Sequence, residues 1–419
     1  MDTEVSSRTE TPRAASDTDK PRAASDTDKP RAASGDPAAR RRPPGCNQVA
    51  LVLQGGGALG AYQAGVYQAL HEAGIEPDFV AGVSIGAING AIIAGNAPEH
   101  RIDRLHAFWD TITARQPGVW SWPSFFGPVD GDEPRRAVST LAAFQAMMFG
   151  QPGFFTPNVP SPWLSPRGAK NATSLYDTAP LRETLHKLID FDRLNAGAVR
   201  YAAGAVAVTS GNFRYFDSTE TTVAVEHVMA SGALPPALPM VRIDHECYWD
   251  GGLVSNTPLQ HVLDHAGTSA RLLTFQVDLF SSRGRLPRDM MDVLSREKDI
   301  RYSSRTRLGT DTFKERFRQR RLIRSLLAKV PEDRLTAEEK ALKASCETLP
   351  EVTLLHLIYE QAAYEGQAKD YEFSAASMRE HWQAGLTDTR ATLKHKDWVK
   401  VASVPAGIVV HDIHRAEEG

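Results

Sequence analysis

The sequence has few cysteines and no long apolar run. Its 419 residues include three cysteines, Cys46, Cys247 and Cys346, which are far apart and odd in number. Such a set does not form a disulfide framework and suits a reducing compartment. No stretch reaches the roughly 18 consecutive apolar residues that a membrane-spanning helix needs. We therefore expect a cytoplasmic protein whose contact with the inner face of the membrane, where it exists, is peripheral.

The N-terminal segment also lacks the apolar run of a signal peptide. It consists instead of a nine-residue repeat, RAASDTDKP, which begins at Arg13 and again at Arg22, with a third start at Arg31. A segment of alternating charges with Ala, Ser and Pro cannot bury enough apolar surface to offset the loss of conformational entropy on folding. Residues 1–46 are therefore predicted to be a disordered tail.

Neither sign of charge dominates. Lys and Arg total 48 against 51 Asp and Glu, a formal charge of -3, so no global basic field points to a nucleic-acid partner. His245 and Cys247 lack a second pair of ligands at a suitable spacing, so we expect no metal site and no cofactor. The hydrophobic fraction of 42% is ordinary for a globular protein and allows a sizeable core.

The regular part of the chain begins at Asn47 with alternating strands and helices. Short apolar runs predict strands at Gln48–Gln54, Phe79–Val83, Val199–Val208 and Leu272–Leu279, and helical spacing predicts helices at Ala61–Ala73 and Ile85–Ala94. A strand–helix–strand–helix start of this kind predicts a parallel sheet that is covered by helices on both faces.

The glycine loop, residues 55–60, allows two interpretations. Gly55, Gly57 and Gly60 match the dinucleotide fingerprint G-x-G-x-x-G between a strand and a helix. That fingerprint also needs an acid at the C-terminal end of the second strand, whereas Asp78 precedes that strand. A nucleotide-binding oxidoreductase is therefore the weaker alternative.

The second strand runs into the sequence G-x-S-x-G at Gly82, Ser84 and Gly86. A serine on a tight strand-to-helix turn needs small neighbours and projects its hydroxyl at a helix N-terminus, as in the nucleophile elbow of serine hydrolases. The alternative is a tight turn with a helix-capping serine. The flanking apolar strand and helix favour the nucleophile.

A nucleophilic serine needs a base and an oxyanion hole. The histidines after Ser84 lie in no distinctive setting, whereas Asp250 precedes Gly251 and Gly252, which let the chain turn tightly and bring a short carboxylate close to another segment. By itself, Asp-Gly-Gly is more often a surface turn.

Together, the triple glycine, the G-x-S-x-G turn and the later Asp-Gly-Gly resemble the patatin-like phospholipase family, from Val49 to about Leu279. The resemblance implies a three-layer α/β/α fold and ester hydrolysis by a Ser–Asp dyad, with Ser84 as nucleophile and Asp250 as base. It also implies an oxyanion hole formed by the amides of Gly56, Gly57 and Ala58. Consecutive glycines would present such amides without obstruction.

The sequence departs from the usual pattern of that family at two positions. Gln54 stands where an acid often precedes the glycines, and Leu59 stands where a Lys or Arg is common. Loss of the cation weakens the expectation of a phospholipid head group more than that of esterase chemistry. An aspartate with an ordinary pKa is a poor base for a serine, so we predict that burial against Trp249 and Leu253 raises the pKa of Asp250.

A Pro-rich, aromatic insert occupies about residues 108–166 of a predicted catalytic domain at 47–280. Its aromatic residues are Phe108, Trp109, Trp120, Trp122, Phe125, Phe126, Phe149, Phe154, Phe155 and Trp163. They suit an acyl-chain pocket or lid, and equally a layer that covers one face of the sheet.

A mostly helical C-terminal extension is predicted at 281–419. Residues 301–330 contain ten Lys and Arg, which suit a solvated helix packed on the core better than an interfacial helix. Residues 354–396 are predicted to be helical, and residues 369–385 resemble the extension of a bacterial subgroup of the same family. Ile408–His411 suits either a last strand or a docking tail.

The combined expectation is a cytoplasmic serine hydrolase that cleaves carboxyl esters of phospholipids, lysophospholipids or acylglycerols through an acyl-enzyme. An acyltransferase would use the same acyl-enzyme, and a non-catalytic lipid-binding module would keep the fold without turnover. The expected partner is the lipid ester itself, with peripheral membrane contact as a further interaction.

Overall fold

A computed structural model of the chain describes residues 42–114, 131–267, 270–304, 306–347, 349–362, 364–401 and 403–412. The repeats of the N-terminal segment, up to residue 41, and residues 115–130 of the aromatic insert lie outside the described residues. At the start of the described part, the two terminal guanidinium nitrogens of Arg42, Nη1 and Nη2, bind the carboxylate of Asp78.

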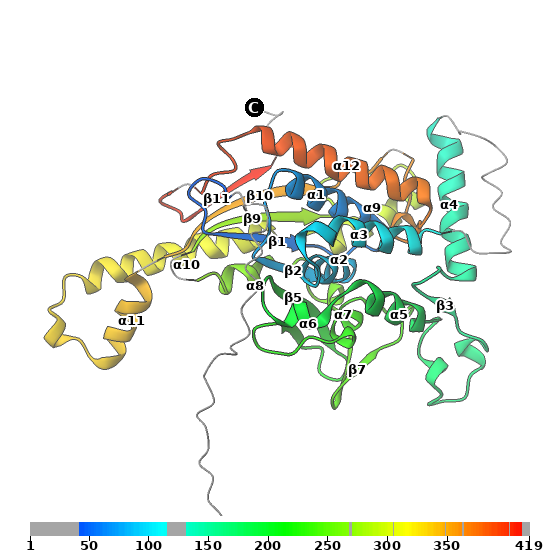
Figure 1. Cartoon of the computed structure of the whole chain (residues 1–419), viewed down its shortest axis with the longest axis horizontal. Helices are drawn as coiled ribbons and strands as arrows, with labels where there is room; N and C mark the ends of the chain where they lie inside the picture. Colours follow the sequence, from blue (N-terminus) through cyan, green and yellow to red (C-terminus); the bar gives the residue numbers. More distant parts are fainter. Residues whose placement is uncertain are drawn as a thin grey trace, which may run out of the picture. The chain divides into compact units, whose positions relative to one another are not determined.

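The core of the protein is a nine-stranded, mostly parallel sheet (Figure 1). Its path is β11-β10-β9-β1-β2-β5-β8-β7, and β6 also pairs with β5. The parallel strands are β1 (Gln48–Leu53), β2 (Phe79–Val83), β5 (Arg200–Ala207), β9 (Arg271–Asp278), β10 (Glu351–Ile358) and β11 (Ile408–Asp412). The antiparallel strands are β6 (Phe213–Asp217), β7 (Val241–Ile243) and β8 (Glu246–Asp250), and β3 (Thr156–Pro157) pairs separately with β4 (Tyr176–Asp177).

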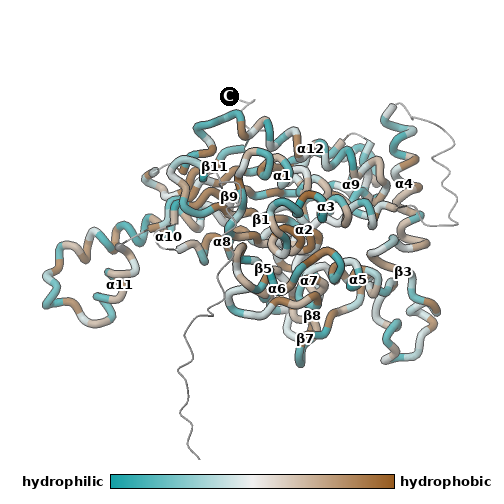
Figure 2. Tube along the Cα trace, in the orientation of Figure 1, coloured by the Kyte–Doolittle hydropathy of each residue, from teal (hydrophilic) through white to brown (hydrophobic). Residues whose placement is uncertain are grey.

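Helices cover both faces of this sheet. Alternate residues of β1 point to opposite faces, so Leu51 and Leu53 join one apolar cluster while Ala50 and Val52 join another. The first cluster includes side chains of α1 (Ala61–Glu72), α2 (Ile85–Ala94), α3 (Pro98–Ile112), α5 (Ala179–Leu188), α7 (Val225–Ser231) and α12 (Ala375–Lys394). The second includes those of α8 (Leu259–Asp264) and α10 (Thr306–Leu327). The fold is thus a three-layer α/β/α sandwich, as predicted, with the most apolar segments in its centre (Figure 2).

The remaining helices are α4 (Asp132–Phe149), α6 (Phe191–Asn195), α9 (Met290–Tyr302) and α11 (Ala337–Glu347). Among the described residues, no helix is long and apolar enough to cross a membrane.

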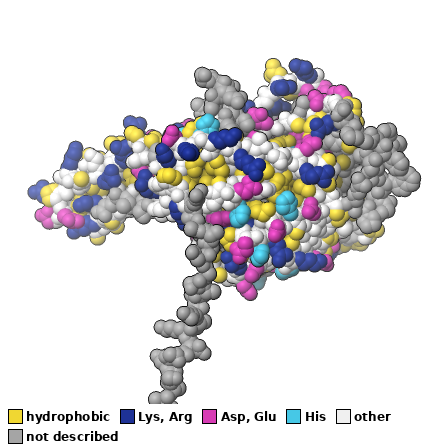
Figure 3. All heavy atoms as spheres, turned by 45° about the horizontal axis from the view of Figure 1, so that its top comes forward, with side chains coloured by type: hydrophobic (Ala, Val, Ile, Leu, Met, Phe, Trp, Pro, Cys, Tyr) yellow, Lys and Arg dark blue, Asp and Glu magenta, His cyan; other side chains and the backbone are white. Residues whose placement is uncertain are grey.

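The basic helix predicted within 301–330 is α10, and only its first half packs on the sheet. Phe313 and Phe317 are buried in the second apolar cluster, while Leu322 and Leu326 are more than half exposed. The second half extends with α11 away from the sheet, and Lys and Arg side chains line this projection (Figures 1 and 3). The packed half agrees with the interpretation of a helix that rests on the core.

The prediction of helix over all of 354–396 is wrong at its start. Residues Glu351–Ile358 form strand β10, which lies between β9 and β11 and is buried on both faces. A short, continuous apolar run fits a buried strand or a buried helix equally well, so periodicity alone does not distinguish them. The predicted helix is present from Ala375 to Lys394, and Ile408–Asp412 is a strand. The sheet therefore continues past residue 280.

Helices α1 and α12 cross at very close range through two glycines. A Cβ atom on Gly385 would lie 2.0 Å from the carbonyl oxygen of Tyr62, and one on Gly65 would lie 1.9 Å from that of Trp382. Hydrogen bonds flank the crossing, from Trp382 Nε1 to Gln68 Oε1 at 2.6 Å and from the Tyr62 hydroxyl to Asp388 at 2.8 Å. The C-terminal helix is therefore packed as tightly as an element of the core.

The close crossing predicts that a single methyl group added at Gly385 destabilises the protein. Gly385→Ala should lower the free energy of unfolding by about 1–3 kcal/mol, because the two helices must separate to admit the Cβ atom. Gly366→Ala is the matched control, since a Cβ there meets nothing within 4 Å. Urea unfolding of both variants measures the difference. Equal stability of the two would contradict the close crossing.

Candidate active site

Ser84 lies on the turn between β2 and α2 with strained backbone angles. Its φ of 56° lies in the left-handed region, which non-glycine residues rarely adopt. The turn is held by the Ser84 amide, which donates to the Ser231 hydroxyl at 3.0 Å, and that hydroxyl donates to the carbonyl of Gly204 at 2.7 Å. A Cβ on Gly86 would lie 2.3 Å from the carbonyl of Leu53, so the turn needs a glycine there. The geometry is that of a nucleophile elbow.

Strand β5 brings Asp250 to this turn. Gly204 pairs with Val83, the residue before Ser84, and the next residue, Ala205, pairs with Asp250. Two segments that are more than 160 positions apart in the chain are thus aligned by consecutive residues of one strand. The alignment requires close backbone contact, since a Cβ on Gly251 would lie 2.5 Å from the carbonyl of Gly204.

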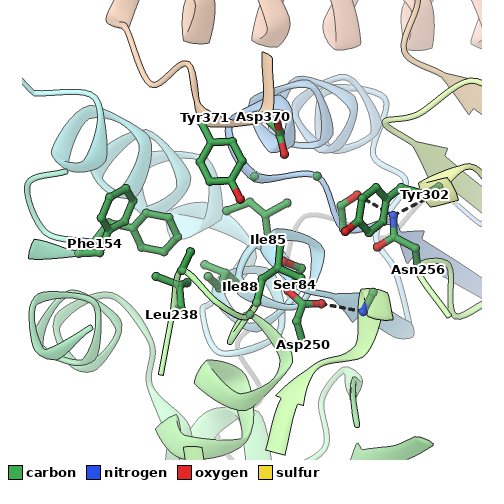
Figure 4. Close-up of a pocket in the computed structure, with 18 of the residues that line it drawn as sticks. Ser84, Ile85, Ile88, Phe154, Leu238, Asp250, Asn256, Tyr302, Asp370 and Tyr371 are labelled. Carbon is green, nitrogen blue, oxygen red and sulfur yellow. Dashed lines mark hydrogen bonds between the residues drawn. The ribbon is translucent and has the colours of Figure 1, made fainter. Parts of the chain in front are cut away.

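The carboxyl group of Asp250 is buried beside Ser84, and the two side chains point toward one another (Figure 4). Burial raises the pKa of Asp250 to about 7, and hydrogen bonds from the Ser84 hydroxyl and from the Gly252 amide oppose that rise. The Gly252 amide donates to Oδ1 at 2.7 Å. The expected direction of the pKa shift is therefore confirmed, while Leu253, which was expected to bury Asp250, is itself 44% exposed.

The raised pKa predicts a stability penalty that depends on pH. Between about pH 4 and 7 the folded protein keeps a proton on Asp250 that the unfolded chain releases, so the free energy of unfolding falls as the pH rises through this window. A neutral asparagine at this position carries no such penalty. Asp250→Asn should therefore melt at a higher temperature than the wild type at about pH 8, with a difference that shrinks toward about pH 5.

Calorimetry of both proteins across this range measures the effect, and Asp264→Asn, an exposed aspartate on α8, is the control. A melting temperature that is lower for Asp250→Asn at alkaline pH would contradict the burial of a costly carboxylate.

The glycine loop faces the same site. Gly55, Gly56 and Gly57 line a cavity together with Ser84 and Asp250. Within the described part of the chain, the amide N–H groups of Gly56, Gly57 and Ala58 donate to no protein acceptor. These are free donors of the kind that an oxyanion hole requires. Ala58 is buried and is not part of the cavity wall.

The other predicted glycines shape the site from outside or at its edge. Gly252 lines the cavity, whereas Gly60, Gly82, Gly86 and Gly251 lie behind it, at the helix and strand contacts. Asp78, the residue considered for a nucleotide, accepts a hydrogen bond from the Val49 amide at 2.8 Å. It lies at the end of β2 opposite to Ser84, which removes the geometric basis for a dinucleotide site.

The cavity beside Ser84 has mainly apolar walls. Beside Ser84, apolar side chains come from α2, from the aromatic insert and from the loop after α7: Ile85, Ile88, Phe154, Phe155, Leu234 and Leu238 (Figure 4). No histidine is among the described residues that line it. A wall of this kind suits an acyl chain, and Asp250 is the titratable group in contact with Ser84.

The aromatic insert serves two purposes in different parts. Phe154 and Phe155 belong to the cavity wall, while Phe108 and Trp109 are fully buried in the core behind it. Trp163 is exposed on a short 3₁₀ turn. Trp120, Trp122, Phe125 and Phe126 lie outside the described residues.

Comparison with known families gives this arrangement a context. A family model described as "Patatin-like phospholipase" matches residues 51–263, just over half of the chain, and so includes Ser84 and Asp250. The chain belongs to the patatin-like phospholipase family. A second model, described as "Patatin phospholipase", matches residues 300–403.

Similarity to individual proteins is local. The chain is 59% identical over 49 residues to "Lysophospholipase nte1" of Aspergillus terreus and 54% identical over 48 residues to "Patatin-like phospholipase domain-containing protein 7" of Rattus norvegicus. Each match covers 12% of this chain and only 3% or 4% of the relative. The solved structure of VipD from Legionella pneumophila aligns with 83% of this chain and 67% of its own, at 15% identity and a TM-score of 0.38.

Gln54 explains one departure from the pattern of the patatin-like family. Its amide nitrogen donates to Thr257 Oγ1 at 2.9 Å and to the Tyr302 carbonyl at 3.0 Å. Its oxygen accepts from the amides of Leu279 and Phe280 at 2.6 and 2.9 Å. An ionised acid has no donor for the first two contacts, so glutamine is the better residue here. Leu59, the other departure, is fully buried in the core.

Asn256, which the sequence analysis did not single out, holds the glycine loop in place. Its side-chain amide nitrogen donates to the backbone carbonyls of Gly55 and Tyr302, both at 3.0 Å. Its backbone carbonyl accepts a hydrogen bond from the Gly55 amide at 3.2 Å. A Cβ on Gly55 would lie 2.4 Å from its side-chain oxygen. In the sequence, the only indication of this role is that Asn256 stands six residues after Asp250.

The C-terminal region of this patatin-like protein forms part of the cavity. Asp370, Tyr371 and Phe373, all within the second family match, line it. Asp370 and Tyr371 lie across the cavity from Ile85 and Ile88 of α2 (Figure 4). Gly57 has a φ of 55°, and a Cβ on it would lie 2.3 Å from the Asp370 carbonyl oxygen. The short helix at Lys369–Tyr371 therefore rests directly on the glycine loop.

Two ion pairs fasten this short helix to α9. The ammonium group of Lys298 binds the Asp370 carboxylate and the Gln367 carbonyl, and that of Lys369 binds Asp299 at 2.7 Å. The sequence resemblance at 369–385 pointed to this segment but not to its place at the active site, because the pairing partners lie about 70 positions away.

Proposed function

We propose that the protein is a serine acyl hydrolase that cleaves carboxyl esters of lipids. The observation that carries the proposal is the pairing of Ser84, on a strained turn, with a buried Asp250 inside an apolar cavity. Membership of the patatin-like phospholipase family supports lipid ester hydrolysis in general. The dyad and the substrate are our own inference.

In the proposed mechanism, ionised Asp250 takes the proton of the Ser84 hydroxyl as its oxygen attacks the ester carbonyl. A pKa of about 7 makes Asp250 a far better proton acceptor than an ordinary aspartate. The amides of Gly56, Gly57 and Ala58 would receive the negative charge that develops on the carbonyl oxygen. Asp250 then returns the proton to the leaving alcohol, and water repeats the sequence on the acyl-enzyme.

The cavity supports recognition of the acyl chain rather than of a charged head group. Its wall contains Ile88, Phe154, Phe155 and Leu238 but, among the described lining residues, no Lys or Arg. Leu59 supplies no cation at the glycine loop, and Lys298 is paired with Asp370. Phospholipids, lysophospholipids and acylglycerols all present such a chain. The name of one relative, a lysophospholipase, favours a monoacyl lipid within this class.

Labelling with a fluorophosphonate probe, together with turnover of a short p-nitrophenyl ester, tests this proposal. The wild type should be labelled and active, and Ser84→Ala and Asp250→Asn should each lower turnover by at least about a thousandfold. Ser325→Ala, an exposed serine on α10, is the matched control and should behave as the wild type.

Other results would redirect the assignment. Full activity of Asp250→Asn would mean that another group is the base. A wild type that is neither labelled nor active, yet binds lipid, would be a lipid-binding module. Ester formation with added glycerol in place of fatty-acid release would indicate an acyltransferase, since both reactions use one acyl-enzyme.

A further inference from the structure

Large apolar side chains are exposed on three segments that connect to the cavity wall, and we call these segments the rim. They are the end of α4 (residues 144–149), the turn after Asp250 (residues 253–254), and the start of α9 with its preceding loop (residues 286–291). Leu286 is 89% exposed, Met290 is 69% exposed, and Phe144, Met148 and Val254 are each more than half exposed. Exposure of this extent at several neighbouring segments is characteristic of a binding surface.

Each segment of the rim is attached to the cavity wall. The carbonyl of Met147 accepts a hydrogen bond at 2.6 Å from the hydroxyl of Tyr176, a lining residue. Leu253 and Val254 directly follow Gly252, which also lines the cavity. The third segment lies between two lining residues, Phe280 before it and Tyr302 at the end of α9. Each of the three segments is therefore connected, by a hydrogen bond or along the chain, to residues that line the cavity beside Ser84.

The third segment combines its apolar residues with positive charge. Arg283, Arg285 and Arg288 are exposed and interleave with Leu286 and Met290. The two nearby acids accept hydrogen bonds from backbone amides at the start of α9. The Asp289 carboxylate accepts from the Asp292 amide at 2.8 Å, and the Asp292 carboxylate accepts from the Arg288 amide at 3.0 Å. Arginines beside exposed leucine and methionine suit a surface that is apolar beneath and negatively charged at its head groups.

We propose that this rim is a docking surface for anionic lipid membranes and that residues 283–291 are its main anchor. The inference builds on the proposed lipid-ester activity, because a substrate that resides in a bilayer must pass from the membrane into the cavity. The exposed leucines of α10 belong to the projection formed with α11, and no residue of α10 is among the described residues that line the cavity. The basic helix is therefore not the anchor.

Vesicle cosedimentation with the full chain tests the proposal, using vesicles of phosphatidylcholine alone and vesicles that also contain phosphatidylglycerol. The wild type should bind the anionic vesicles more tightly. Leu286→Ser with Met290→Ser should weaken binding to both kinds by about tenfold or more. Arg285→Gln with Arg288→Gln should weaken binding to anionic vesicles by about twenty-fivefold, since each of the two charges contributes about fivefold, and should leave the weak binding to neutral vesicles unchanged.

Leu322→Ser with Leu326→Ser on α10 is the control, because these leucines are also more than half exposed but do not line the cavity or directly adjoin a lining residue. It should bind as the wild type does, and every variant should hydrolyse a soluble p-nitrophenyl ester at the wild-type rate. Loss of binding in this control alone, unchanged binding in both rim variants, or a wild type that binds neither kind of vesicle would overturn the proposal. Vesicle binding without ester hydrolysis would instead overturn the proposed activity and leave the docking surface standing.

Discussion

The structure depends on a carboxylate that is held out of water beside a serine. Consecutive residues of β5 align Val83 and Asp250, and this register brings Ser84 next to Asp250. Burial raises the pKa of Asp250 to about 7, which gives the carboxylate the basicity that the proposed reaction needs. The same burial makes the folded state less stable at alkaline pH, and the strained φ of Ser84 adds to this cost.

Segments that are far apart in the sequence hold the glycine loop beside Ser84 and Asp250. Gln54 and Asn256 hold the glycine loop with hydrogen bonds, and the short helix at Lys369–Tyr371 packs directly against Gly57 of this loop. That helix is in turn fastened to α9 by ion pairs and continues into α12, which crosses α1 at the closest range that glycines allow. The C-terminal region is thus a structural part of the candidate active site.

Local chemistry made the start of the fold, as far as α2, predictable from the sequence. Apolar strands that run into glycines and into G-x-S-x-G fixed β1, β2 and α2 within one residue, and the raised pKa of Asp250 followed from its expected burial. Strand β10 was mistaken for helix because a short apolar run has no distinguishing period. Tyr371, Lys298 and Asn256 were missed as site residues because only long-range packing brings them to Ser84 or to the glycine loop.

The pH dependence of kcat/KM with a soluble p-nitrophenyl ester is the most direct test of the central claim that Asp250 is the base. The account predicts activity that rises with pH along a single limb with an apparent pKa near 7, because only the ionised carboxylate accepts the proton of Ser84. A rate that is already at its plateau at about pH 5, or that falls as Asp250 ionises, would contradict it.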